Sequence, residues 1–291
     1  MVEEDCSKCP GAVSTLGDAL DEEGHYFDFI KFYKKVEFCD RSLRLEILKE
    51  TRKGPTSAND EELPINSIVV AAKSVVLQKM LSTGMKEANK SAPVVIKVTA
   101  EEKTAFKEML HFLYAGSLSP RLLEATIDVR ELVALLVLGD KFEVPSLMGT
   151  VVRCISTRRK CIPDSTVLAT EIPDTRLQLR QVKKLADDAR AHVVETYADV
   201  SGTWESEAFM SLSLEVIEIL MQAEELEAEN EEEIVEKLLG WIRGKYDALS
   251  ARRRVVRDLT PHIRFFSLTG EALERFLSTP EMQSKGTETN R

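Results

Sequence analysis

INSIVVAAKSVVLQKMLSTGMKEANKSAPVVIKV, residues 65–98, is the stretch that decides the fold. Its pattern predicts a short strand, a helix, a charged turn and a second strand. The helix is expected from Val69, with one apolar face made by Val75, Val76, Met80 and Leu81. Gly84 is placed to end it, because glycine readily adopts the left-handed conformation of helix C-termini. Met85 and Glu87 then put an apolar side chain and a carboxylate on an exposed corner, which suits a docking surface better than a reaction centre.

The region before this stretch predicts two strands and a tail. Aromatic and polar residues alternate over 26–32, and apolar and charged residues alternate over 43–47. A period of two is typical of a half-buried strand. A loop rich in breaker residues follows at 52–62, and residues 1–25 hold few large apolar side chains, so we expect them to be disordered.

The rest of the chain predicts helices. Thr99 and Glu102 form a capping box, and apolar residues recur after it at helical spacing, at Phe106, Met109, Leu110 and Leu113. Further helices are predicted over 129–138, from Pro145, and over 165–170, 175–198, 209–221, 230–246, 251–259 and 270–277. The expected fold is therefore α+β and mostly helical: a mixed domain over 26–157, an all-helical domain over 158–280, and a disordered tail over 281–291.

Composition excludes several classes of protein. The chain has 291 residues, 43% of them hydrophobic, and a formal net charge of −10, which disfavours binding to a phosphate backbone. No apolar run approaches the ~20 residues that a bilayer-crossing helix needs, and the acidic N-terminus is unlike a secretory signal. Five cysteines without a repeating spacing are typical of a reducing compartment. We expect a soluble intracellular protein, in the nucleus and/or the cytoplasm.

Catalysis and metal binding lack a candidate constellation. The Cys6–Cys9 pair has no second pair near it to complete a zinc site, and the four histidines are scattered. Carboxylates lie near one another at Asp128, Glu131, Asp140 and Glu143, but their spacing is that of a solvated helix face. We therefore predict no catalytic residue, no metal and no cofactor.

Charged residues elsewhere leave alternatives open. Asp40 lies between two strand patterns, and Lys73 is a plausible partner for it. Basic clusters at 158–160 and 252–254 are either solvated surface or functional. A functional cluster would be a nuclear localisation signal or a patch for an acidic partner. The acidic run over 224–236 is most simply a solvated loop and helix start.

Several landmarks together resemble a BTB/POZ domain followed by a BACK domain. The BTB landmarks are FCDR at 38–41, AAKS at 71–74, GMKE at 84–87, LY at 113–114 and DKFEV at 140–144. The BACK landmarks are WIR at 241–243 and IRFF at 263–266. The order and spacing of these motifs, over roughly residues 26–280, are closest to the plant POZ/BTB-containing group of light-response and ligase-adaptor proteins.

This resemblance implies a non-enzymatic substrate adaptor of a cullin-3 type ubiquitin ligase. It implies a homodimer, or a heterodimer with other BTB proteins, with Asp40 and Lys73 as the charged pair of the dimer groove. Met85 and Glu87 match the segment by which such domains bind the cullin. Since relatives continue into a β-rich region beyond the position of Arg291, the unknown protein substrate is expected to bind the BACK domain, the N-terminal tail or a partner adaptor.

One feature of the sequence keeps a second function open. Val75-Val76-Leu77 replaces the aromatic pair usual in the family, which should thin the packing around the dimer and cullin faces. The alternative is a dimeric interaction scaffold or transcriptional co-regulator that does not recruit a ligase. Neither function requires a membrane or direct contact with nucleic acid.

Overall fold

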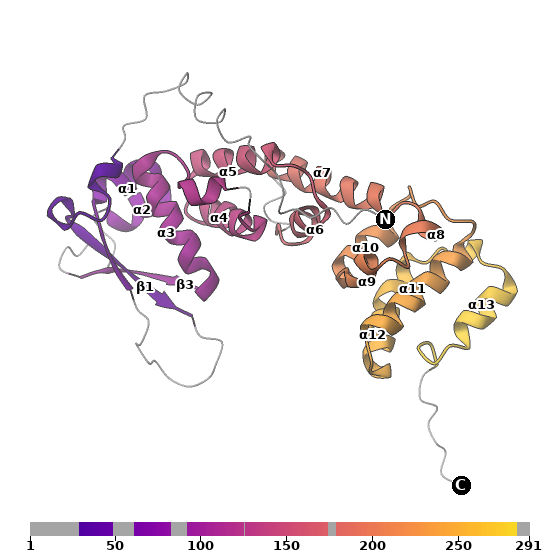
Figure 1. Ribbon diagram of the computed structural model, residues 1–291. Coiled ribbons are helices and arrows are strands. Elements are labelled where there is room, and N and C mark those ends of the chain that lie inside the picture. Colours follow the sequence, from indigo (N-terminus) through magenta and orange to yellow (C-terminus); the bar gives the residue numbers. More distant parts are fainter. Residues whose placement is uncertain (1–28, 49–60, 83–91, 125, 174–178, 284–291) are drawn as a thin grey trace, which may run out of the picture. The chain divides into compact units, whose positions relative to one another are not determined.

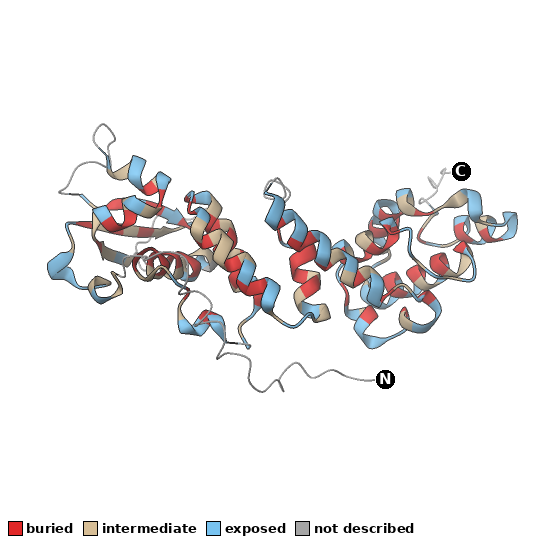
Figure 2. Ribbon diagram, turned by 90° about the horizontal axis from the view of Figure 1, so that it is seen from above, coloured by how far each residue is buried: buried red, intermediate tan, exposed pale blue. Residues whose placement is uncertain are grey.

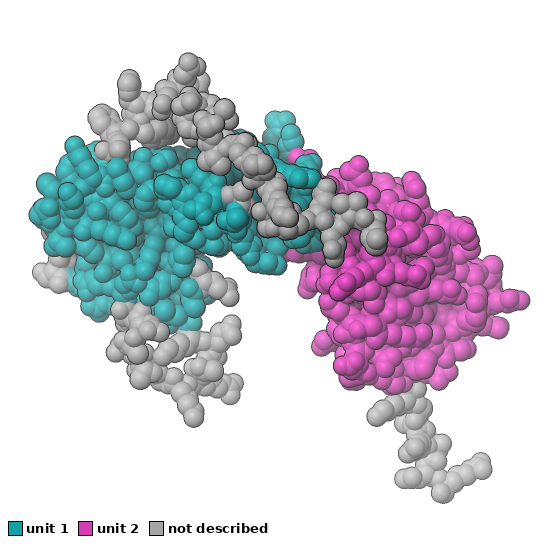
Figure 3. Space-filling view, in the orientation of Figure 1, with its two compact units in different colours: residues 1–167, 171–185 teal, residues 168–170, 186–291 magenta. Residues whose placement is uncertain are grey.

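The computed structural model describes residues 29–48, 61–82, 92–124, 126–173 and 179–283 (Figure 1). The chain divides into two compact units, one of residues 1–167 and 171–185 and one of residues 168–170 and 186–291 (Figure 3). The predicted tail over 1–25, the Cys6–Cys9 pair, Met85, Glu87 and residues 284–291 lie outside the described residues.

The first unit contains the sheet, which has three strands in the order β2-β1-β3. They are β1 (Arg41–Ile47), β2 (Glu61–Ile65) and β3 (Val94–Val98). β1 runs antiparallel to β2, with Leu43 opposite Leu63, and parallel to β3, with Leu43 opposite Val94. Alternate residues of β1 and β3 are buried, so one face of this mixed sheet belongs to the core.

Helices are interspersed with these strands and follow them along the chain (Figure 1). In chain order they are α1 (Ser67–Lys73), α2 (Val75–Leu81), α3 (Ala100–Ala115), α4 (Val129–Lys141), α5 (Pro145–Thr157), α6 (Ile162–Thr170) and α7 (Arg180–Thr196). α3 packs on β1 and β3 and then on α4, which packs on α5. The predicted capping box is present, and the predicted core positions of α3 are all buried: Phe106, Met109, Leu110 and Leu113. Figure 2 shows the buried residues gathered along one side of the helices.

Two predictions in this unit are wrong. A strand was expected over 26–32, but its residues 30–32 form the 3₁₀-helix η2 (Ile30–Phe32). A second 3₁₀-helix, η3 (Val36–Phe38), follows. The Phe29 N–H donates to the Tyr114 carbonyl on α3 at 3.0 Å, so this segment packs on a helix and not in the sheet. The helix expected from Val69 is two helices, because Ser74 has the extended conformation φ −128°, ψ 114°.

The apolar face predicted for that helix is only partly buried. Val75 is 40% exposed, whereas Val76, Met80 and Leu81 are half-buried. The buried residues of the two helices are Val69, Val70 and Leu77.

The described residues of the second unit form helices joined by short turns, with one isolated β-bridge between Asp199 and Glu227. Its further helices are α8 (Val200–Thr203), α9 (Glu207–Ser211), α10 (Leu214–Gln222), α11 (Glu231–Lys245), α12 (Leu249–Leu259) and α13 (Gly270–Leu277), with short 3₁₀ turns η7 (Thr260–His262) and η8 (Phe265–Ser267). The helix predicted over 209–221 is interrupted at Leu212 and Ser213, and α8 was not predicted. Trp204 and Trp241 are almost fully buried and anchor the core. The mostly helical α+β fold predicted from the sequence is confirmed.

Candidate interaction surface

A hydrogen-bonded cluster on the first unit joins the segment before β1 to the start of α1. The carboxylate of Asp40 accepts from the Ser67 N–H at 2.7 Å and from the Ser67 hydroxyl at 2.5 Å. Asn66 caps α1 by accepting from the backbone N–H groups of Ile68 and Val69. Its side-chain amide donates to the Phe38 carbonyl at 3.0 Å. These bonds fix η3 against the first turn of α1.

The environment of Asp40 keeps it ionised. Partial burial by itself would raise the pKa of this carboxyl, but the side-chain and backbone hydrogen bonds from Ser67 outweigh burial and leave the pKa below its usual value. The negative charge also lies next to the N-terminus of α1, where the helix dipole favours an anion.

Apolar side chains stand exposed around this cluster. Val36 is 70% exposed, Phe38 is 47% exposed and Ile68 is 78% exposed. Because the Asn66–Phe38 bond holds η3 beside α1, we treat these three residues as one surface, the η3–α1 patch. Exposed apolar groups that cluster around a fixed polar centre are typical of a protein–protein contact.

Tyrosines support the patch from behind. The Tyr114 hydroxyl accepts from the Asn66 N–H at 2.7 Å, and the Tyr33 hydroxyl donates to the Lys107 carbonyl on α3. Burial raises the pKa of Tyr33 to about 12, with nearby Glu108 adding to the shift, so this phenol stays protonated. The ring of Phe32 meets that of Phe38 edge-on with centroids 4.7 Å apart. The patch therefore rests on a rigid support.

The predicted dimer residues Asp40 and Lys73 lie at opposite ends of α1. Asp40 binds Ser67 at the first position of the helix, whereas Lys73 is its last residue and is partly buried. Their role between subunits stays a prediction. Sequence reasoning missed Ser67 as the partner of Asp40, although an asparagine directly before an apolar run signals a helix start at this position.

Ser74 connects α2 to the turn between α4 and α5. Its hydroxyl accepts from the Leu77 N–H at 3.1 Å and donates to the Phe142 carbonyl at 2.7 Å, and the residue is 1% exposed. Glu143 has a φ of 50°, the left-handed region, where it closes α4 much as glycine would. These bonds anchor the start of α2, the helix that precedes residues 83–91 in the chain. Those residues contain Met85 and Glu87.

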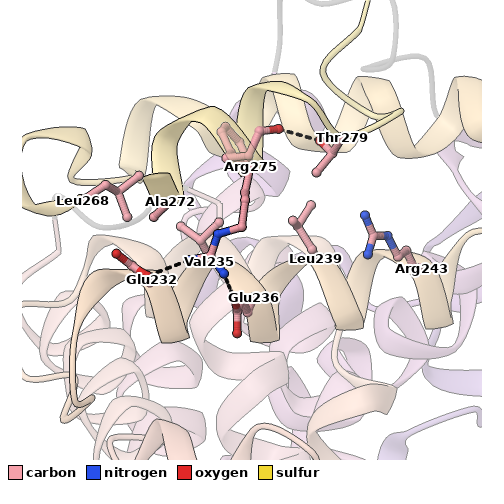
Figure 4. A pocket seen from close by; sticks show the side chains of 10 residues that line it. Glu232, Val235, Glu236, Leu239, Arg243, Leu268, Ala272, Arg275 and Thr279 are labelled. Carbon is pink, nitrogen blue, oxygen red and sulfur yellow. Dashed lines mark hydrogen bonds and ion pairs between the residues drawn. The ribbon is translucent and has the colours of Figure 1, made fainter. Parts of the chain in front are cut away.

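The second unit has a small hollow between α11 and α13 (Figure 4). Its volume is about 160 Å³, well below the several hundred Å³ typical of small-molecule sites. Figure 4 shows Arg275 reaching across it toward α11, where its guanidinium pairs with Glu232 at 2.9 Å and Glu236 at 3.5 Å. The charges that line this hollow are therefore matched by one another, as in a packing seam.

Both predicted basic clusters contain arginines with structural partners. Arg158 donates to the Ile127 carbonyl at 2.9 Å and pairs with Asp164 at 3.3 Å. Arg252 pairs with Glu281, and Arg253 donates to the Pro280 carbonyl. These contacts give Arg158, Arg252 and Arg253 a structural role that neither interpretation of the clusters included.

The described residues contain no group of three or more His, Cys, Asp or Glu side chains that could hold a metal ion. Within the same residues, no helix is both long enough and apolar enough to cross a membrane.

Comparison with known proteins identifies both domains. Residues 29–158 match the family described as the BTB/POZ domain, and residues 178–278 match the BACK family, described as BTB And C-terminal Kelch. The chain thus carries a BTB/POZ domain followed by a BACK domain. Both are protein-interaction domains, and the matches identify no catalytic domain.

The chain is distantly related to Arabidopsis thaliana proteins of this kind. It is 32% identical to BTB/POZ domain-containing protein At2g46260 over 224 residues, which are 77% of this chain and 38% of that protein. The identity to BTB/POZ domain-containing protein At4g01160 is also 32% over 224 residues, covering 77% of this chain and 41% of that protein. A third, BTB/POZ domain-containing protein At2g30600, is 24% identical over 267 residues, 84% of this chain and 30% of its own length. The chain therefore spans less than half the length of these relatives.

Proposed function

We propose that this chain is a substrate-specific, non-enzymatic adaptor of a cullin-3 type ubiquitin ligase, acting in the nucleus and/or the cytoplasm. The observation that carries the proposal is the succession of a BTB/POZ domain and a BACK domain in one chain. In such an arrangement one domain can dimerise and dock a scaffold while the other positions a recruited protein. The finer assignment, to the plant light-response group, rests on the sequence landmarks and belongs to the same proposal.

In this proposal the cullin binds near Met85 and Glu87. A flexible thioether fills an irregular apolar notch, and the carboxylate supplies a charge-assisted hydrogen bond. Support comes from α2, whose start is anchored by the hydrogen bonds of Ser74 to Leu77 and Phe142. A short, anchored helix before the contact segment limits the conformational entropy that binding must overcome.

Dimerisation in this proposal uses the η3–α1 patch. Val36, Phe38 and Ile68 would be covered by the same residues of a second copy, as a two-fold interface requires. Asp40 would lie at the rim of this interface, and Lys73, at the other end of α1, would be its charged partner in the dimer groove.

Reversing the charge of Glu87 tests the cullin contact. We expect Glu87→Arg to weaken binding of a purified cullin-3 N-terminal domain by about tenfold or more, because it sets a cation against the cullin's own donor. Glu124→Arg is the matched control, since Glu124 is an exposed carboxylate of the same domain outside the contact. Isothermal titration calorimetry measures both affinities.

The same measurement separates the two functions. Absence of cullin binding by a dimeric wild-type chain would favour the interaction scaffold or transcriptional co-regulator. Equal binding by wild type and Glu87→Arg would remove Glu87 from the contact.

A further inference from the structure

A second and larger hollow lies in the second unit, between α7 and α10. Its volume is about 1000 Å³. The C-terminal half of α7 forms one wall with Arg190, Ala191, Val194 and Glu195, and Ala198 follows just after its end. The other wall is formed by Ile219 and Gln222 of α10, with Ala223 directly after it. Each wall follows helical spacing, so each helix presents one continuous stripe to this space. We call it the α7–α10 groove.

The groove is separate from the core-facing side of α7. Val193 and Tyr197 are buried in the unit, whereas Val194 and Ala198 are half-buried and line the groove. Ile219 on α10 is also half-buried. The floor is thus made of aliphatic side chains of small or medium size, which let another backbone approach closely.

A β-bridge between two segments of the chain contributes to the lining of the groove. Asp199 and Glu227 form an isolated parallel β-bridge, with the Glu227 N–H donating to the Ala198 carbonyl at 2.8 Å and the Val200 N–H donating to the Glu227 carbonyl at 3.1 Å. This bridge fixes part of the acidic run that the sequence predicts to be a solvated loop. It brings Glu225 and Glu227 to the groove beside Glu195 and Asp199.

The rim of the groove carries more carboxylates than cations. Four carboxylates line it against one guanidinium, that of Arg190, which lies 3.7 Å from Asp187 on its own helix. Neither Glu195 nor Glu227 has an ion-pair partner among the residues that the structure describes. By contrast, the carboxylates beside the α11–α13 hollow, Glu232 and Glu236, both pair with Arg275. The α7–α10 groove is therefore short of cations.

We propose that the α7–α10 groove binds a basic amphipathic helix of a partner protein. Apolar residues at helical spacing on that helix would lie on Val194, Ile219 and Ala223, and flanking Lys or Arg side chains would reach the acidic rim. The lining of α7 extends from Arg190 to Thr196, a length of roughly 9 Å, so about two turns of the partner helix would be in contact. That this partner is the protein recruited for ubiquitination rests on the proposed function, whereas the binding itself does not.

Charge complementarity selects this occupant over others. A nucleic acid or an anionic membrane would be repelled by the four carboxylates, and an acidic peptide would be repelled in the same way. A wholly apolar helix would leave Glu195 and Glu227 partly desolvated without a partner, which is costly.

A displayed library of helical peptides of about fourteen residues, selected against the full chain, is the probe. We expect the enriched peptides to share an apolar stripe at helical spacing flanked by Lys or Arg. Their affinity should fall as sodium chloride rises, because exposed charge pairs are screened beyond about 8 Å at physiological ionic strength.

The double variant Glu195→Lys, Glu227→Lys locates the binding site. Both residues are exposed, so the fold should be kept, and thermal unfolding checks this. We expect the double variant to bind the selected peptides about tenfold more weakly or worse. Glu274→Lys, at an exposed position of α13 outside the groove, is the control and should bind as wild type does.

Two results would overturn the proposal: enriched peptides without a basic flank, or equal affinity for the wild type and the double variant. Cullin binding by the same double variant is measured separately and should equal that of the wild type. If the chain binds the peptides but no cullin, this inference stands and the adaptor function is contradicted. If it binds the cullin but no peptide, the adaptor function stands and this inference is contradicted.

Discussion

At the scale of single residues, the carboxylate of Glu281 joins the segment after α13 to α11 and α12. Its side chain is 1% exposed and accepts two hydrogen bonds from Arg243, each at 3.1 Å, and a third from Arg252 at 3.3 Å. The bonds from Arg243 lead in lowering the pKa of Glu281 below its usual value, against the opposing effect of burial. The sequence places this residue in a tail, because partners from α11 and α12 leave no local pattern around it.

We expect Glu281→Gln to lower the free energy of unfolding of the second unit by about 1–2 kcal/mol. The loss stays below that for a fully buried ion pair because the side chain of Arg243 is 45% exposed and water screens it. Urea unfolding followed by tryptophan fluorescence measures it, since Trp204 and Trp241 both lie in this unit. Glu274→Gln, an exposed carboxylate of α13, should change it by less than about 0.5 kcal/mol.

The pH dependence of this variant has a definite sign. A carboxyl whose pKa is lowered by folding stabilises the folded state above its unfolded pKa of about 4.3, and that contribution is lost as the pH falls through the folded-state pKa. The difference in stability between wild type and Glu281→Gln should therefore be constant near neutral pH and shrink in acid below about pH 4. A difference that grows in acid would contradict the assigned role of Glu281.

At the scale of elements, the hydroxyl of Ser74 makes two hydrogen bonds at the break between α1 and α2. Ser74 caps α2 through Leu77 and also binds the Phe142 carbonyl, so it joins α2 to the end of α4. We expect Ser74→Ala to destabilise the first unit by about 2 kcal/mol, through loss of the cap and of a buried hydrogen bond. Circular dichroism during chemical denaturation measures the change. The control Ser82→Ala removes an exposed hydroxyl that binds only the Lys79 carbonyl, and a loss as large as that of Ser74→Ala would show that the buried bond is not the cause.

Elements that carry their own signal could be predicted from the sequence, and elements set by distant contacts could not. The helix α3 begins with a capping box and keeps one apolar period, so its start and its buried residues were predicted correctly. The segment at 29–32 has the alternation of a strand, but its backbone bonds to Tyr114 on α3 and it forms a 3₁₀ turn. The break at Ser74 depends on Phe142, which lies 68 residues further along the chain.

The candidate site follows the same rule. The charge of Asp40 was evident from its position between two strand patterns, but Ser67, which binds it within the chain, was missed. The pairing of Asp40 with Lys73 stays a prediction. The η3–α1 patch could not be predicted, because Val36 and Ile68 become neighbours of one cluster only through the bond between Asn66 and Phe38. Single exposed apolar residues are common, and it is their convergence that signals an interface.

At the scale of the whole molecule, dimerisation is the property that the η3–α1 patch predicts. We expect the wild-type chain to be a dimer at micromolar concentration and Ile68→Asp to be a monomer, since the new carboxylates would face each other across a two-fold axis beside Asp40. Ile68 is 78% exposed, so the substitution should leave the thermal unfolding temperature of the fold nearly unchanged. Multi-angle light scattering measures the mass.

The control is Leu277→Asp, which places the same charge at a 50% exposed apolar position of α13 in the second unit. It should remain a dimer, because an interface built on the first unit is indifferent to a charge on α13. A monomeric wild type, or a dimer that survives Ile68→Asp, would contradict dimerisation through Val36, Phe38 and Ile68. In the second case the two copies must associate through another surface, and loss of the dimer in Leu277→Asp would place that surface on the BACK domain.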